Sequence, residues 1–146
     1  MMLSMLLSLI KRFIIVIIFV ALAGAALWYI PNPGKALFAA AYQPVLEGVL
    51  VDPQNPYRET TYPLPGHTGL WQKNKGQSVY LSWNNFTDIE HYAKETMPQN
   101  GWTYVDRMGA AFFFEKSGYR LTLTAHRYLN FFGKPAYKLT YTVPRV

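Results

Sequence analysis

The segment SVYLSWNNFTDIEHYAKETMPQNGW, residues 78–102, decides the fold because a strand pattern in it passes directly into a helix pattern. Apolar and polar residues alternate from Ser78 to Trp83, which is typical of a strand with one buried face. The next apolar residues recur at the spacing of a single helix face: Ile89, Tyr92, Ala93 and Met97. Pro98 and Gly101 then end the helical pattern. We therefore predict a strand followed by one helix.

The start of this helix carries the sequence Thr87-Asp88-Ile89-Glu90, which has the spacing of a capping box. In that motif the Thr87 hydroxyl accepts a hydrogen bond from a backbone amide of the first turn, and the Glu90 side chain reaches back. Asn85-Phe86-Thr87 is formally an N-glycosylation acceptor, but capping explains Thr87 without a sugar. We predict that Thr87 caps the helix.

Four more strand patterns follow the helix, at residues 102–106, 111–115, 119–126 and 137–143. Short turns, Arg107-Met108-Gly109 and Ser117-Gly118, separate the first three of them. Their alternation requires one covered face, and one helix can cover one face of an antiparallel sheet. The predicted fold class is α+β, a small two-layer domain with one helix on an antiparallel sheet in the order β-α-β-β-β-β.

The chain before this domain begins with an uncharged apolar run from Phe13 to Ile30, which as a helix would reach roughly 27 Å, close to the hydrocarbon thickness of a bilayer. Lys11 and Arg12 precede it, and Trp28 and Tyr29 lie in its last turn, where aromatic rings favour the headgroup layer. By the positive-inside rule the N-terminus is cytoplasmic and the remaining chain is exported.

The alternative for this segment is a cleavable signal peptide that releases a secreted soluble domain. Ala21-Leu22-Ala23 and Ala23-Gly24-Ala25 both fit an A-x-A cleavage site. The segment before Lys11 is apolar, however, where a signal peptide is basic and polar. We therefore predict a retained, single-pass signal-anchor helix in a bacterial inner membrane, with the domain periplasmic or extracellular.

Seven of the ten prolines precede Gly66, which indicates an extended connector between anchor and domain. Within it, the apolar residues 36–42 could form two turns of helix that lie on the membrane surface or pack on the domain. We predict a juxtamembrane interfacial helix followed by a strand-like tether. The predicted organisation is a cytoplasmic segment at 1–12, a transmembrane helix at 13–30, a proline-rich juxtamembrane tether at 31–69 and an exported α+β domain at 70–146.

Composition argues against nucleic acid as a partner. From Asp52 onward there are eleven Lys and Arg against seven Asp and Glu, a balance of +4. These basic residues are scattered along the chain, whereas a nucleic-acid surface needs them clustered on one face. The chain has no Cys, which excludes disulfides, thiolate metal sites and a lipidated Cys.

Parts of the chain resemble a group of small bacterial envelope domains. The resemblance lies in Pro63-Leu64-Pro65-Gly66, in the helix and Met-Pro followed by Gly-Trp over 89–102, and in Phe114-Glu115-Lys116-Ser117-Gly118 at a hairpin. It covers about half of the chain and implies an α+β fold in the envelope behind a signal or anchor, with no particular activity. The chain departs from the group in its aromatic insert at 128–132 and in its proline-rich tether.

No arrangement of residues identifies a reaction. His67, His91 and His126 lie far apart and lack metal-ligand spacing, and no nucleophile, phosphate or dinucleotide motif is present. We therefore predict no catalytic residues, no metal and no cofactor. An enzyme acting on envelope polymers, with a site assembled from distant positions, is the alternative.

Aromatic residues, 16% of the chain, suggest two partner-binding surfaces. Tyr128, Phe131 and Phe132, flanked by Arg127 and Lys134, fall where a hairpin loop is expected, and they either pack under the sheet or form an exposed docking tip. The second candidate, expected on the sheet face away from the helix, comprises Trp71, Tyr80 and Arg120. The predicted function is binding of another envelope protein, as an accessory, inhibitory or toxin-immunity protein.

Overall fold

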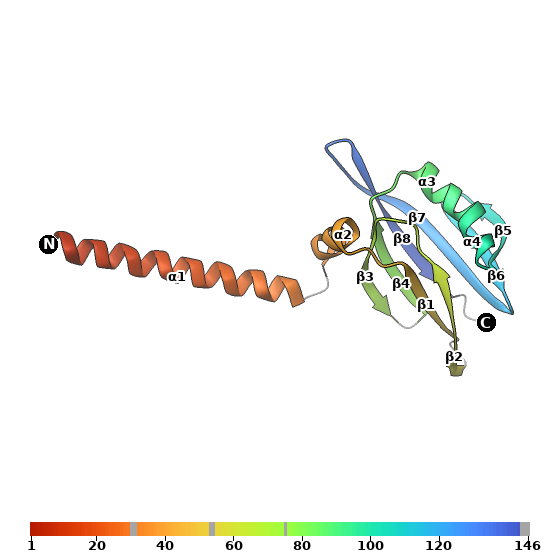
Figure 1. Cartoon of the computed structure of the whole chain (residues 1–146), viewed down its shortest axis with the longest axis horizontal. Helices are drawn as coiled ribbons and strands as arrows, with labels where there is room; N and C mark the ends of the chain where they lie inside the picture. The colour runs from red at the N-terminus through yellow and green to blue at the C-terminus, as the bar shows by residue number, and fades with distance from the viewer. Residues whose placement is uncertain (30–31, 53–54, 75, 144–146) are drawn as a thin grey trace. The chain divides into compact units, whose positions relative to one another are not determined.

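The structure is a computed structural model that describes residues 1–29, 32–52, 55–74 and 76–143 (Figure 1). The side chains of Trp28 and Tyr29, predicted to mark the end of the anchor, lie outside the described residues, as do Ile30 and Pro31. The chain divides into two compact units, Met1–Asn32 and Pro33–Val146.

The first unit is helix α1, Met2–Tyr29, which confirms the predicted apolar helix at the N-terminus. It is the one helix in the described residues that is long and apolar enough to cross a membrane. Its apolar part, Met2–Ala26, reaches a mean hydropathy of 2.6. A signal sequence near the N-terminus has the same properties. The helix begins at Met2, so Lys11 and Arg12 lie within it rather than before it.

The second unit contains an antiparallel sheet that, in the described part of the chain, has six strands in the order β3-β4-β8-β7-β6-β5. The strands are β3 Thr68–Asn74, β4 Gln77–Ser82, β5 Thr103–Met108, β6 Ala111–Lys116, β7 Tyr119–Phe131 and β8 Lys134–Thr142. Two-residue turns join β6 to β7 at Ser117-Gly118 and β7 to β8 at Phe132-Gly133, and all four turn residues have positive φ. Such turns match the right-handed twist of paired strands.

A continuous helical segment between β4 and β5 covers one face of the sheet. It consists of α3 Phe86–His91, the π-helical turn η1 Tyr92–Thr96 and α4 Met97–Gln99. Pro98 has no N–H to continue the hydrogen-bond ladder, and Gly101, at φ +88°, closes the segment as predicted.

The predicted cap at Thr87 is wrong, because the N-cap is Asn85. Asn85 is extended, and its Oδ1 accepts a hydrogen bond from the Asp88 amide at 2.8 Å. Thr87 already lies in the first turn. Glu90, the other half of the expected box, instead binds Lys94 at 3.3 Å and Arg107 at 2.5 Å.

Replacing the cap side chain tests this assignment. We expect Asn85→Ala to lower the free energy of unfolding by about 1 kcal/mol, because the Asp88 amide loses its acceptor. Thr87→Ala is the matched control and should change it far less. Urea denaturation of both variants measures the difference. A larger loss in Thr87→Ala than in Asn85→Ala would contradict the assignment.

Residues 33–69 form part of the folded unit rather than a tether. Helix α2, Pro33–Tyr42, packs on β3 and β4 through Ala36 and Ala40, which are fully buried. A Cβ at Gly69 of β3 would lie 2.2 Å from the Ala36 carbonyl oxygen. The backbone of α2 therefore packs directly on the backbone of β3. The Trp83 indole N–H also donates to the Leu37 carbonyl at 2.9 Å. This segment is therefore held on the sheet by close packing through Ala36 and Ala40.

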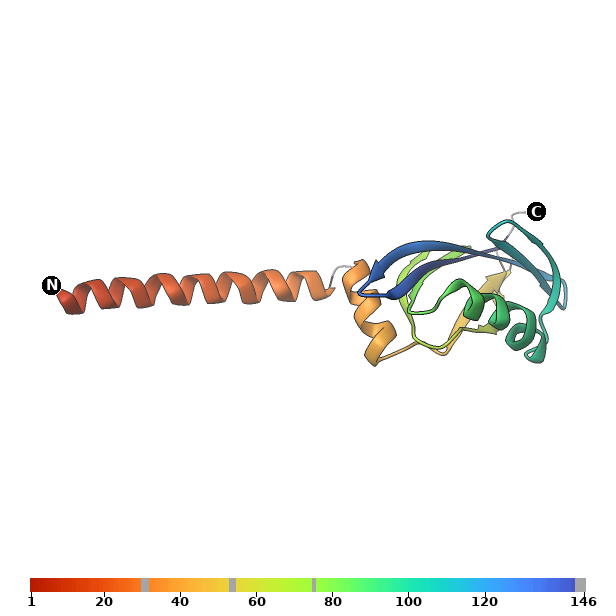
Figure 2. The same cartoon turned by 90° about the horizontal axis from the view of Figure 1, so that it is seen from above.

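Two of the prolines that suggest an extended tether, Pro56 and Pro63, lie within an antiparallel strand pair, β1 Glu47–Asp52 and β2 Asn55–Pro63. Leu50, Tyr62 and Leu64 of this region are buried in the same core as the helical segment and the sheet. The order of elements therefore differs from β-α-β-β-β-β, because α2, β1, β2 and β3 precede β4. Figure 2 shows the helical segment and the β1–β2 pair on the same side of the curved sheet.

A cluster of buried tyrosines ties the β1–β2 pair to the helical segment and the sheet. The Tyr62 and Tyr80 hydroxyls lie 3.0 Å apart, and those of Tyr92 and Tyr141 lie 2.9 Å apart. The rings of Tyr62 and Tyr141 stack with centroids 4.6 Å apart. Tyr92 also donates to the Pro63 carbonyl. Burial raises the pKa of Tyr62, Tyr92 and Tyr141 well above the ordinary value, so these hydroxyls stay neutral.

Candidate binding surface

Strands β7 and β8 extend beyond the rest of the sheet (Figure 1). Strand β7 pairs with β6 as far as Thr124, which lies opposite Ala111. Strand β8 pairs with β4 only from Tyr137 onward, opposite Ser82. Among the described strands, residues 129–131 and 134–136 therefore pair only with each other. We call this extension, together with the residues of β7 that lead into it, the projecting hairpin (residues 126–136).

The end of the projecting hairpin is apolar and exposed. Phe131 is 58% exposed and Phe132 is 92% exposed, with ring centroids 4.5 Å apart. Of these two, only Phe132 lies in the turn, because β7 continues through Tyr128 to Phe131, where a loop was expected. The alternative that the rings pack beneath the sheet is wrong for Phe131 and Phe132. Lys134 begins β8 directly after the turn.

A second aromatic group lies at the base of the projecting hairpin. The Trp71 and Tyr128 rings meet edge to face with centroids 5.6 Å apart, and the Lys138 ammonium lies 5.6 Å from the Trp71 ring. Trp71 and Tyr128 each sit at a shift in strand register, in β3 and β7 respectively. Such bulges re-aim side chains, which explains how the two rings converge. We call these three residues the Trp71 cluster.

The Trp71 cluster joins residues that were assigned to separate surfaces. The sequence predicts one surface with Trp71, Tyr80 and Arg120 and another with Tyr128, and it does not indicate Lys138. The register shifts that bring Trp71 and Tyr128 together cannot be seen in an alternation pattern. Lys138 could have been found from its strand, because it alternates with the buried Leu139 and therefore faces away from the helical segment.

The prediction that Tyr80 lies on the sheet face away from the helix is wrong. Tyr80 is 3% exposed and belongs to the cluster of buried tyrosines. Both faces of β4 are buried, so alternation in this strand could not distinguish them.

Arg120 is exposed and pairs with Glu115 at 3.5 Å. It lies eight residues before Tyr128 along β7, about 26 Å away at the rise of a strand. Arg120 is therefore not part of the Trp71 cluster.

The charge of this region has one sign. Between residues 119 and 143, which include all of β7 and β8, the sequence has four Lys and Arg residues and no Asp or Glu. These are Arg120, Arg127, Lys134 and Lys138. Arg127 is exposed and opposite Tyr137, at the point where β8 leaves β4. The projecting hairpin and its base therefore combine exposed rings with positive charge.

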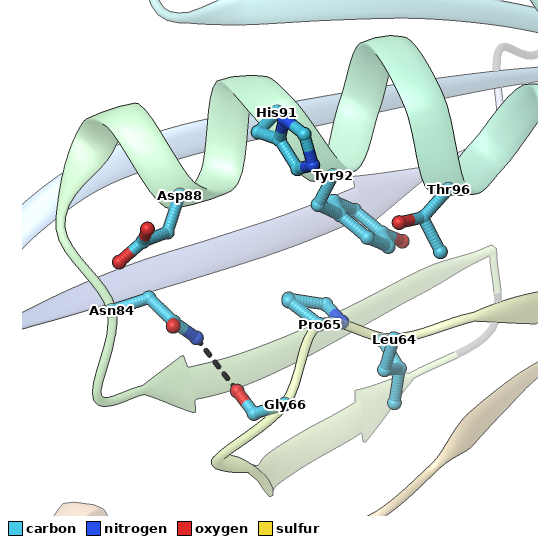
Figure 3. Close-up of a pocket in the computed structure, with 8 residues that line it drawn as sticks. All are labelled: Leu64, Pro65, Gly66, Asn84, Asp88, His91, Tyr92 and Thr96. Atoms are coloured by element: carbon cyan, nitrogen blue, oxygen red, sulfur yellow. Dashed lines mark hydrogen bonds between the residues drawn. The ribbon is translucent and has the colours of Figure 1, made fainter.

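An open pocket of about 360 Å³ lies between the helical segment and the loop from β2 to β3 (Figure 3). Its lining includes Asp88 and His91 of the helical segment, and in Figure 3 Asp88 lies nearer to Asn84 than His91 does. His91 is 66% exposed, and its Nε2 lies 3.1 Å from a Glu95 carboxylate oxygen.

Among the residues that the structure describes, no three His, Asp or Glu side chains are placed to hold a metal ion. Comparison of the chain with protein-family models, with curated proteins and with solved structures gave no match.

Proposed function

We propose that this chain is a membrane-anchored envelope protein whose exported domain binds another envelope protein. The observation that carries the proposal is the Trp71 cluster, in which an indole, a phenol ring and an ammonium group meet at the base of a projecting hairpin. Trp and Tyr supply large contact areas at low entropic cost, and they dominate the energetics of protein interfaces.

The chemistry of the surface selects the kind of partner. Strands β7 and β8 carry basic residues and no acidic ones, so a partner with an acidic surface is attracted and a basic one is repelled. Beside the cluster the same sheet face continues through Thr124 and Thr140, which are opposite each other and half-buried. An accessory, inhibitory or toxin-immunity protein would use such a face to cover a complementary protein surface.

The anchoring part of the proposal rests on α1. From Phe13 to Tyr29 the helix has no charged residue and is about 26 Å long, close to the hydrocarbon thickness. Lys11 and Arg12 would then lie at the cytoplasmic headgroups, with the domain on the other side of a bacterial inner membrane. Both a retained anchor and a cleaved signal export the domain, and retention keeps it near membrane-bound partners.

Crosslinking in cells, followed by pull-down of the intact protein, tests the proposal. We expect one specific envelope protein to be recovered with the natural chain. Trp71→Ala combined with Tyr128→Ala should lower its recovery by at least about tenfold, because two aromatic anchors are lost. Met108→Ala, an exposed change at the end of β5, is the control and should leave recovery nearly unchanged. Recovery that is insensitive to the double variant would contradict the proposed surface.

A further inference from the structure

The projecting hairpin is not the only exposed apolar surface in the second unit. On α2 the side chains of Phe38 and Tyr42 are 47% and 74% exposed, with ring centroids 4.9 Å apart. Leu46, shortly after the helix, is 74% exposed. Ala36 and Ala40 face β3, so these larger residues occupy the outer side of α2. Residues 32–46 contain one Lys and no Asp or Glu.

The register of the sheet places α2 and the projecting hairpin at the same end of the domain. Gly69, which contacts α2, is paired with Leu81. The next residue of β4, Ser82, is paired with Tyr137, where β8 leaves β4 to enter the projecting hairpin. Figures 1 and 2 both show α2 and this hairpin at one end of the sheet. Two exposed ring pairs with basic neighbours therefore share one end.

That end is also where the chain comes from α1. Three residues, 30–32, separate the last residue of α1 from the first of α2. Four Cα–Cα steps reach at most about 15 Å, so Pro33 stays within that distance of Tyr29 in any arrangement. If α1 is anchored in a membrane, α2 begins at the membrane surface.

We infer that the turn of the projecting hairpin and the outer side of α2 dock on the bilayer that holds α1, with Phe131, Phe132, Phe38 and Tyr42 entering the headgroup layer. This inference rests on the anchoring proposed above. Aromatic rings favour this layer, and Lys134 and Arg127 supply attraction to anionic lipid headgroups.

The absence of Cys allows a direct test with single-cysteine variants of the whole chain. Phe132→Cys, Met108→Cys and Val20→Cys would each carry an environment-sensitive fluorophore. Met108, 73% exposed at the β5–β6 turn, is the control within the same unit, and Val20 reports on α1. The protein would be placed in nanodiscs of phosphatidylcholine, alone or mixed with phosphatidylglycerol, that contain spin-labelled lipid as a quencher.

We expect lipid to quench the labels at residues 132 and 20, but not the label at residue 108. Phosphatidylglycerol should increase quenching at residue 132. Each basic side chain strengthens attraction to an anionic surface by about fivefold, so Lys134→Gln should lower the docked-to-undocked ratio by that factor. Lys73→Gln is the charge-matched control, because Lys73 lies opposite Ser78 at the other end of β3 and β4.

The possible failures can be told apart. A quenched label at residue 20 with an unquenched, water-exposed label at residue 132 would overturn the inference and leave the anchoring intact. An unquenched label at residue 20 would overturn the anchoring and the inference together. A label at residue 132 that is shielded from water without being quenched by lipid would indicate a contact between two copies, and would also overturn the inference.

Discussion

Stability of the domain is expected to fall steeply as the pH rises above about 10, the ordinary pKa of tyrosine. Burial raises the pKa of Tyr62, Tyr92 and Tyr141 above their ordinary value of 10.0. In the folded protein they keep their protons at a pH where the unfolded chain loses them. Their stabilising contribution is therefore fully present below pH 10 and is lost as the pH rises toward the folded pKa values. Each tyrosine contributes a slope of about 1.4 kcal/mol per pH unit.

Urea denaturation at a series of pH values across this range measures the effect. With all three tyrosines the slope approaches about 4 kcal/mol per pH unit. Tyr141→Phe is the informative variant. It should lower the free energy of unfolding at neutral pH by about 1 kcal/mol, because the hydrogen bond between the Tyr141 and Tyr92 hydroxyls is lost while Tyr92 still donates to the Pro63 carbonyl. It should also reduce the slope of the unfolding free energy above pH 10 by the contribution of one tyrosine, about 1.4 kcal/mol per pH unit. A slope unchanged by this variant would show that Tyr141 is not the buried group assigned here.

Gly69→Ala is expected to have the largest effect of any single methyl addition in the second unit. The new Cβ would lie 2.2 Å from the Ala36 carbonyl oxygen and 2.8 Å from the Ala40 amide nitrogen. Both are backbone atoms of α2, so no side chain can rotate away. We expect a loss of at least about 3 kcal/mol in the free energy of unfolding, or detachment of α2 from β3.

Gly66→Ala is the control for this variant, because a Cβ at Gly66 meets nothing within 4 Å and Gly66 has no positive φ. Denaturation measures the loss, and hydrogen exchange distinguishes its two forms. Detachment would expose the α2 amides while the sheet amides stay protected. Equal stability of the two variants would contradict the packing of α2 on β3, and with it the assignment of residues 33–42 to the folded unit.

The part of the fold that could be predicted has strong local signals. Alternation from Tyr119 to Ala125 is confirmed in β7, and the Ser117-Gly118 turn joins the strands as expected. An antiparallel sheet with a helix of the predicted length follows from these patterns. The capping residue was missed by two positions because Asn85 and Thr87 are both good caps, and only the backbone conformation selects between them.

The part that could not be predicted depends on contacts distant in sequence. The β1–β2 pair contains Pro56 and Pro63, which weaken a strand pattern, yet Tyr62 is 1% exposed because the tyrosine cluster holds it. Helix α2 is short and weakly patterned, and its place depends on the absence of a side chain at Gly69. The Trp71 cluster depends on two bulges in separate strands.

The most direct test of the central claim is site-specific photocrosslinking with the anchored protein in cells. A photoreactive residue would replace Tyr128, Lys138 or, as a control, Met108. We predict that positions 128 and 138 crosslink to the same envelope protein and that position 108 does not, because Met108 is 73% exposed but lies on β5, at the opposite edge of the sheet from Trp71 on β3. Crosslinks to that protein from position 108 alone, or no crosslinked protein at 128 and 138, would contradict the account.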